Sequence, residues 1–286
     1  MSNFRPKAME LIRSGYDLHI HPLPSHLERL QDDIEVVRAA AGVGMAGVML
    51  KNHYESTAGR AALTNRISQC STRAYGGLVL NWPAGGLNPF AVESALKMGA
   101  AFIWLPTRDA ANCLRFGDMD GDFFHRPGIS VFDGEKNLLP AIYEIMEVVR
   151  RYDAVLATGH ISTEETISVC KAGREMGIKM VFTHPEWPRT LAPKEVQREM
   201  ADLGVMIEKN WMNLAEHLIE KDLFIDNIRT VGPERVYIAT DRGQSNRETP
   251  VEGMLRCIET LLDSGFHEQE IKMMLCQVPA YLIEGK

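Results

Sequence analysis

The sequence lacks three features that would assign it to large classes of proteins. Its five cysteines form no CxxC pair, so neither a zinc knuckle nor a disulfide framework is indicated. No uncharged apolar stretch approaches the roughly 20 residues that a membrane span requires, and no signal-peptide run follows the charged residues 1–13. The formal net charge is -7, so the excess of positive charge that binds nucleic acid is absent. We therefore expect a cytoplasmic protein that acts on a small molecule.

What the chain does have is a strict alternation of short apolar runs and amphipathic segments. The runs expected to be strands lie near residues 17–21, 47–51, 76–80, 101–105, 154–158, 179–183, 205–208 and 236–240. Eight such units predict one (β/α)8 barrel domain over residues 1–286, because each parallel strand pair needs a helical crossover. An open doubly wound sheet is the alternative, but Gly42 and Gly44 precede a strand instead of following one as a dinucleotide fingerprint does.

Two additions to the plain barrel are predicted. A last helix is expected over about residues 268–283, packed on the outside of the barrel. The connection after the fourth strand, residues 107–137, is much longer than the others and contains Phe123 and Phe124. Connections of this length in a compact domain are usually functional or disordered, and the aromatic residues favour a lid over the site.

Histidines and one aspartate fall at the carboxyl ends of several predicted strands. His19 and His21 alternate along the first strand and therefore project to one side of it. His160, His184 and Asp241 end the fifth, sixth and eighth strands. Because all carboxyl ends of a parallel barrel open on one face, these five side chains are expected to converge.

Imidazoles with one carboxylate and no thiolate favour a divalent metal ion. We expect one or two ions, with Zn²⁺ as the first expectation and Mn²⁺ or Fe²⁺ as alternatives. The ion would lower the pKa of a bound water, Asp241 would accept its proton, and His160 or His184 would help to polarise the scissile carbonyl.

With these motifs the sequence resembles the amidohydrolase superfamily of metal-dependent hydrolases over nearly its whole length. The resemblance implies that His19, His21 and Asp241 hold the buried metal, and that His160 and His184 hold a second metal or contact the substrate. Within the superfamily, the Thr183-His184-Pro185 turn is similar to the branch of uncharacterised cytosolic proteins and aminocarboxymuconate-decarboxylase-like enzymes.

The sequence departs from the commonest binuclear pattern of that superfamily. The fourth strand offers no lysine or glutamate that could bridge two metals. Lys51, at the end of the second strand, is the substitute we consider: it is either a carboxylated metal ligand or a cation that holds a substrate carboxylate. His53 lies two residues further and is expected to contact the substrate.

Arginines in the loops after the fourth and eighth strands suggest an anionic substrate. Arginine binds carboxylates and phosphates in a bidentate manner, so Arg108, Arg126 and Arg242 are predicted substrate contacts, together with Trp187. The predicted reaction is hydrolysis of a C–N or C–O bond, as in a cyclic amide or lactone. A decarboxylase on the same scaffold and a phosphoesterase are the alternatives, and homo-oligomerisation stays open.

Overall fold

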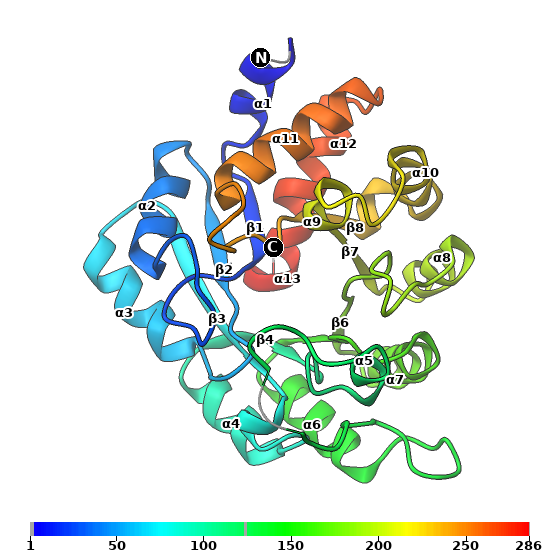
Figure 1. The fold of residues 1–286 in the computed structure, drawn as a ribbon. Helices are drawn as coiled ribbons and strands as arrows, with labels where there is room; N and C mark the ends of the chain where they lie inside the picture. The colour runs from blue at the N-terminus through cyan, green and yellow to red at the C-terminus, as the bar shows by residue number, and fades with distance from the viewer. Residues whose placement is uncertain (1–2, 123–124, 286) are drawn as a thin grey trace.

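The chain forms one eight-stranded parallel sheet in which the strands follow one another in the order of the sequence. This arrangement comes from a computed structural model that describes residues 3–122 and 125–285. Figure 1 looks along the strands, so that the sheet is seen as a ring surrounded by helices. The strands are β1 (Tyr16–Ile20), β2 (Gly47–Leu50), β3 (Arg73–Val79), β4 (Ala100–Trp104), β5 (Val155–Ala157), β6 (Lys179–Phe182), β7 (Met206–Asn210) and β8 (Val236–Ala239).

The ring is closed between its first and last strands. Beyond the end of β8, the amide of Asp241 donates to the His19 carbonyl at 2.8 Å, and the amide of His21 donates to the Arg242 carbonyl at 2.8 Å. Ile20 and Arg242 thereby form a parallel bridge. The predicted (β/α)8 barrel is confirmed, and its closure brings the segment after β8 directly against the histidines of β1.

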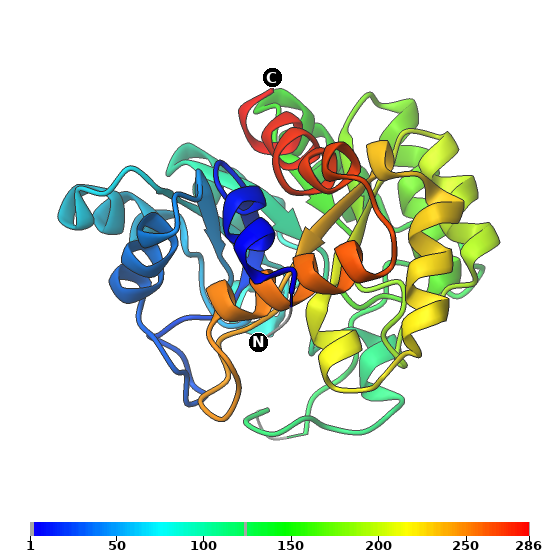
Figure 2. The ribbon, with the colours of Figure 1, turned by 90° about the horizontal axis from the view of Figure 1, so that it is seen from above.

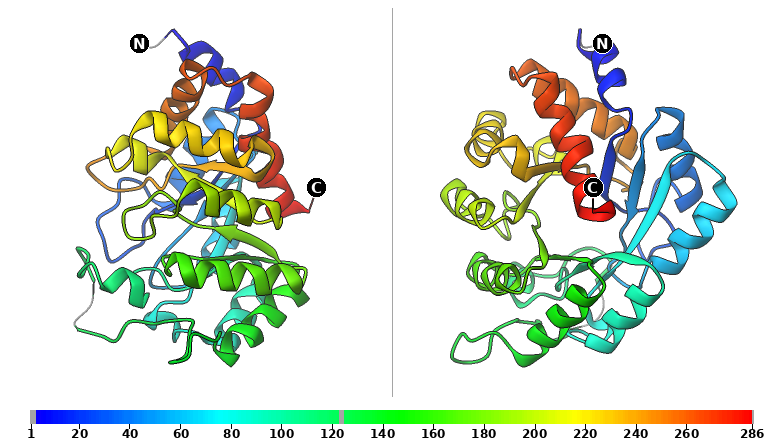
Figure 3. Two further views of the ribbon diagram at one scale, coloured as in Figure 1. Left: turned by 90° about the vertical axis from the view of Figure 1, so that its right-hand side faces the viewer. Right: turned by 180° about the vertical axis from the view of Figure 1, so that it is seen from behind.

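Helices cover the outside of the ring, as the further views show (Figures 2 and 3). Several of their starts carry side-chain caps: directly before the helix Thr163–Glu175, Ser162 accepts from the amide of Glu165, whose carboxylate accepts from the amide of Ser162. The helices are α1 (Arg5–Leu11), α2 (Asp33–Gly42), α3 (Ala58–Ser68), α4 (Pro89–Lys97), α5 (Ala111–Leu114), α6 (Pro140–Arg151), α7 (Thr163–Glu175), α8 (Lys194–Asp202), α9 (Trp211–Ala215), α10 (Lys221–Val231), α11 (Pro250–Asp263), α12 (Glu268–Lys272) and α13 (Val278–Glu284).

The last helical segment closes the amino-terminal end of the barrel instead of lying outside it. From α12 the chain passes through a π-helical turn, Met273–Gln277, into α13. Val278 and Leu282 of α13 pack with the barrel interior, including Tyr16 and Leu18 of β1. In Figure 1 and in the right-hand view of Figure 3, α13 and the C-terminus stand in the middle of the ring. The helix was predicted, but its expected place on the outside is wrong.

The long connection after β4 is confirmed and lies over the carboxyl end of the barrel. It contains α5 and two bridges, of Ala110 with Ile129 and of Phe132 with Leu138. Phe123 and Phe124, on which the lid prediction depended, lie outside the described residues. Among the helices that are described, none has the length and apolar character needed to cross a membrane.

Candidate metal centre

All five predicted ligands lie at the carboxyl end of the barrel. His19 is in β1 and His21 follows it directly, whereas His160, His184 and Asp241 follow β5, β6 and β8. Each is at most 6% exposed. The convergence expected from the strand order is therefore present, and it results from the common direction of the strands.

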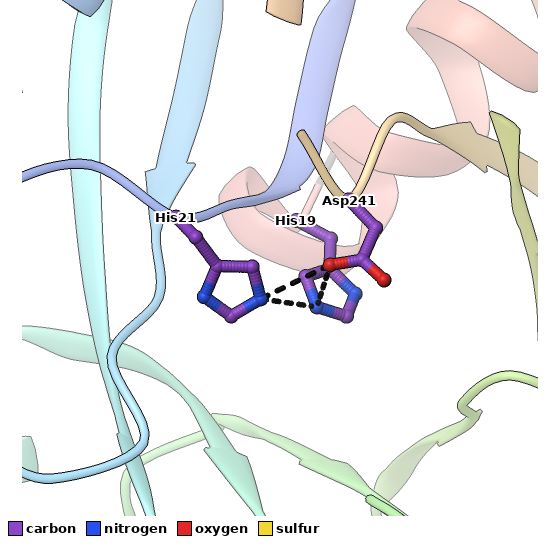
Figure 4. A group of neighbouring side chains, drawn as sticks. All are labelled: His19, His21 and Asp241. Carbon is purple, nitrogen blue, oxygen red and sulfur yellow. Dashed lines mark hydrogen bonds and ion pairs between the residues drawn. The ribbon is translucent and has the colours of Figure 1, made fainter. Parts of the chain in front are cut away.

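His19, His21 and Asp241 form a compact triad (Figure 4). The Nε2 atoms of the two histidines are 3.2 Å apart, and Asp241 Oδ1 lies 3.3 Å from His19 Nε2 and 3.0 Å from His21 Nε2. Ligands held about 2.1 Å from a metal ion are about 3.0 Å apart in octahedral and about 3.4 Å apart in tetrahedral coordination. The three atoms are thus spaced as the ligands of one small divalent ion would be.

The two triad histidines are oriented by hydrogen bonds at their other ring nitrogen. His19 Nδ1 lies 3.2 Å from both carboxylate oxygens of Glu208, and His21 Nδ1 lies 3.1 Å from the carbonyl oxygen of Lys51. Metal-binding histidines characteristically make such a bond, because it fixes the tautomer that leaves Nε2 free for the ion. His19 and His21 therefore have the hydrogen-bonded support of metal ligands.

Glu208 was not among the predicted site residues. It belongs to β7, is fully buried, and also accepts a hydrogen bond from the hydroxyl of Tyr237 at 2.6 Å. Because side chains alternate along a strand, Glu208 points into the barrel, whereas its neighbour Lys209 points outward to Glu186. A signal was present in the sequence, since Glu208, Lys209 and Asn210 are three consecutive polar residues in a buried strand.

His184 and His160 stand next to the triad with different surroundings. His184 Nε2 is 3.6 Å from Asp241 Oδ2, and the ring of His160 lies 5.2 Å from that of His184. The Nδ1 atoms of both rings are buried without a hydrogen-bond partner in the described part of the chain. These two imidazoles thus lack the orienting bond that His19 and His21 have.

The backbone is strained at two of the cluster residues. His184 and Asp241 have φ angles of 52° and 52°, in the left-handed region that residues other than glycine seldom adopt. Gly159, beside His160, also has a positive φ, and a Cβ there would stand 2.3 Å from the Leu105 carbonyl oxygen. Strain of this kind costs about 1–3 kcal/mol per residue and is concentrated at functional sites.

The electrostatics favour the neutral form of four of the site's histidines and the ionised form of Asp241. Burial lowers the pKa of His21, His53, His160 and His184, in the last case to about 4. Burial alone would raise the pKa of Asp241, but the charge of His19 and a hydrogen bond from His21 hold it well below its usual range. Neutral imidazole and ionised carboxylate are the forms that bind metal ions.

Lys51 and His53 follow β2 and reach the same region. Lys51 is 1% exposed, its Nζ lies 2.9 Å from His19 Nε2, and burial lowers its pKa to about 8. The ring of His53 stacks on that of His21 at 4.8 Å, and its Nδ1 lies 2.8 Å from the hydroxyl of Thr107. Carboxylation of Lys51 and substrate contact by His53 stay predictions.

The three arginines predicted to contact the substrate differ in their surroundings. Arg108 lines the cavity above the triad and pairs with Asp122 at 2.8 Å. Arg126 is held by Asp109 and Asp122, and Arg242, 1% exposed, by Glu216 and Glu248. Within the described residues, neither of these two lines the cavity. Their guanidinium groups bind protein carboxylates, and these pairings could not be assigned from the sequence.

The cavity above the triad has a volume of about 1060 Å³ and is lined by all five predicted ligands. Trp187 lines it as predicted, with its ring 4.6 Å from that of His160. The lining residues that were not predicted include Arg29, from the loop after β1, and Gln244, from the loop after β8. Neither belongs to a recognisable motif, so only the folded chain shows where they lie.

Comparison with solved structures shows that this fold is shared with structures of an amidohydrolase, a lactonase and a decarboxylase. An amidohydrolase from Pseudomonas aeruginosa superposes with a TM-score of 0.67 at 12% identity, covering 98% of each chain. A lactonase from Listeria monocytogenes gives 0.63 at 12% identity, covering 96% of this chain and 95% of the other. A 2,6-dihydroxybenzoate decarboxylase gives 0.56 at 12% identity, with coverages of 95% and 99%. The resemblance to the amidohydrolase superfamily is confirmed at the level of the fold.

The sequence comparisons define the family more narrowly. No curated protein matches the chain. One family model, with the description "Family of unknown function (DUF6282)", matches residues 14–208, a span that begins just before β1 and ends in β7 at Glu208. This span includes His19, His21, His160 and His184, and it exceeds half of the sequence. The chain therefore belongs to the family DUF6282.

Proposed function

We propose that this protein is a metal-dependent hydrolase that cleaves a C–N or C–O bond, such as that of a cyclic amide or lactone, in a small anionic substrate. The observation that carries the proposal is the triad, in which two Nε2 atoms and one carboxylate oxygen stand 3.0–3.3 Å apart. The shared fold of the amidohydrolase and lactonase structures is consistent with this chemistry.

His19, His21 and Asp241 would hold the ion, for which we propose Zn²⁺ because the donors are imidazole nitrogen and carboxylate oxygen. When bound, a divalent ion supplies Lewis-acid activation, lowering the pKa of a water molecule from about 16 to about 7. Glu208 and the Lys51 carbonyl keep the two imidazoles in place through their Nδ1 atoms. Rigid support of this kind reduces the reorganisation that binding requires.

The protein residues would transfer the proton, polarise the carbonyl group and position the substrate. Asp241 faces the histidines of β1 with Oδ1, which leaves Oδ2, 3.6 Å from His184 Nε2, to accept a proton and return it to the leaving group. His160 and His184 present neutral rings to the cavity, where they can donate a hydrogen bond to a carbonyl oxygen. Trp187 and Arg108 line the same space and would position the substrate.

Metal analysis of the protein purified without chelator tests the proposal. The wild type is expected to hold at least one divalent ion per chain, and His19→Ala and Asp241→Asn are expected to lose it while staying folded. His267→Asn is the matched control, since this exposed histidine caps α12 and asparagine retains the capping function. A wild-type protein without metal, or triad variants with full metal content, would contradict the proposal.

A decarboxylase is the second candidate, favoured by one feature of the site. Among the four predicted histidine ligands, His19 and His21 carry orienting bonds at Nδ1, whereas the Nδ1 atoms of His160 and His184 are unpartnered in the described residues. This asymmetry favours a single ion, as expected for a non-hydrolytic reaction of an unsaturated acid on this scaffold. Release of CO₂ from such acids, without hydrolysis of lactones or cyclic amides, would select the decarboxylase. Lys51 is tested separately by electron density for a carboxylated side chain.

A further inference from the structure

The loops that follow β1 and β8 are joined by backbone contacts at the edge of the cavity. We call this junction, residues 29–30 and 243–244, the seam. The amide of Leu30 donates to the carbonyl of Gly243 at 2.8 Å, and Arg29 and Gln244 form an antiparallel bridge. Residues directly opposite in such a bridge project their side chains to the same side. Arg29 and Gln244 both line the cavity that contains Asp241, so their side chains stand as neighbours beside the triad.

Arg29 differs from the other arginines that line this cavity. Arg108 pairs with Asp122, and Arg247 pairs with Glu216 at 2.6 Å. In residues 3–122 and 125–285 no carboxylate forms an ion pair with Arg29, and its Nε is buried without a hydrogen-bond partner. Burial lowers the pKa of Arg29, with the charge of Asp241 opposing this and that of Arg108 adding to it. A buried guanidinium nitrogen without a hydrogen-bond partner is costly, and an anion bound to the same guanidinium would offset that cost.

Gln244 offers the complementary unused group. Its Nε2 donates to the carbonyl of Asp241 at 3.1 Å, which fixes the orientation of the amide and turns Oε1 away from that carbonyl. This Oε1 is likewise buried without a partner in the part of the chain described. The seam thus places one positively charged donor and one neutral acceptor next to each other in the lining of the cavity.

We infer that Arg29 and Gln244 form the substrate-recognition subsite of this cavity, and that the substrate carries a carboxylate whose neighbouring atom bears a hydroxyl or an amide N–H. The carboxylate accepts from the Arg29 guanidinium, and the adjacent hydroxyl or N–H donates to Gln244 Oε1. 2-Hydroxy acids and N-acyl amino acids have this arrangement. The inference deepens the proposed function, on which it rests for the reaction, although binding at the seam is measurable without turnover.

The experiment compares two probes that differ in one hydroxyl group. Mandelate has a hydroxyl on the carbon next to its carboxylate, and phenylacetate lacks it. Binding of each to the Zn²⁺-supplemented protein is measured by isothermal titration calorimetry. We expect the wild type to prefer mandelate and Arg29→Gln to bind it at least about tenfold more weakly, because a charge-assisted hydrogen bond is lost. Arg29→Lys keeps the positive charge but not the planar guanidinium that can bind a carboxylate in a bidentate manner, so its mandelate affinity is expected to be intermediate.

Two further variants distinguish specific recognition by Arg29 and Gln244 from a general electrostatic attraction of anions. Gln244→Met is expected to lose the preference for mandelate while keeping phenylacetate binding, which also shows that the site is intact. Arg247→Gln removes a positive charge from the same rim, but that guanidinium already holds Glu216, so mandelate affinity should change by less than about twofold.

Three results would overturn the inference: no saturable mandelate binding by the wild type at millimolar concentration, unchanged affinity in Arg29→Gln, or an equal loss in Arg247→Gln. The outcome is independent of the metal proposal, because metal content is measured on the same samples. A protein without metal whose mandelate affinity still depends on Arg29 would refute the proposed function and support the subsite. A metal-loaded protein whose mandelate affinity does not depend on Arg29 would support the proposed metal site and refute the subsite.

Discussion

Replacing Glu208 by glutamine tests whether the hydrogen bond to His19 supports metal binding. Burial alone would raise the pKa of Glu208, but the charge of His19 and its hydrogen bond lower the value to about 2, so the group is a carboxylate near neutral pH. Both of its oxygens lie 3.2 Å from His19 Nδ1. Glutamine retains the shape but replaces one of these acceptors with an NH₂ donor and removes the charge that favours Nδ1–H.

Loss of such a supporting carboxylate typically weakens metal binding about 10- to 100-fold, which corresponds to about 1.4–2.7 kcal/mol. The affinity is measured by competition with a chromophoric zinc chelator, and circular dichroism checks that the variant is folded. Tyr237→Phe is the matched control, because it removes only the hydroxyl that donates to Glu208 at 2.6 Å and should cost less than about tenfold. A folded Glu208→Gln protein with wild-type zinc affinity would show that the hydrogen bond from His19 to Glu208 does not support metal binding.

Three other predictions concern stability. Removal of metal by a chelator should lower the Tm reversibly, since an ion at 100 times its Kd contributes about 2.7 kcal/mol; identical calorimetric traces with and without metal would contradict this. Lys209→Met leaves the Glu186 carboxylate buried without its cation and should cost about 3–5 kcal/mol in urea unfolding, whereas additional Glu186→Gln should recover part of the loss. Leu282→Ala leaves a cavity where α13 closes the amino-terminal end of the barrel, and it should lower the free energy of unfolding by about 2–5 kcal/mol. The more exposed Tyr281→Ala should lower it by less than about 0.5 kcal/mol. Similar losses of stability in the two variants would argue against this packing of α13.

The fold and the convergence of the triad could be predicted because both depend on local patterns. Alternating apolar runs identified the strands, and parallel strands must share one carboxyl end, so His19 and Asp241 meet although they lie far apart in the sequence. The position of α13 could not be obtained in this way. An amphipathic helix shows which of its faces is apolar, but not whether that face meets the outer helices or the open end of the barrel.

The finer structure of the site depends on contacts that have no local signature. Arg126 and Arg242 resembled substrate contacts because their loops lie on the right face, but Asp109 and Glu216 bind them in the folded chain. Arg29 gave no signal in the sequence, because its place at the cavity results from the backbone bond between Leu30 and Gly243. Charge alone did not distinguish the arginines that bind protein carboxylates from Arg29, which pairs with none among the residues that the structure describes.

A crystal structure with anomalous diffraction data collected at the zinc absorption edge would show whether His19, His21 and Asp241 hold a metal ion. We expect one strong anomalous peak at about 2.0–2.2 Å from His19 Nε2, His21 Nε2 and an Asp241 oxygen. Crystals grown with zinc that show no peak within bonding distance of these three atoms, or a peak only elsewhere on the protein, would contradict this expectation.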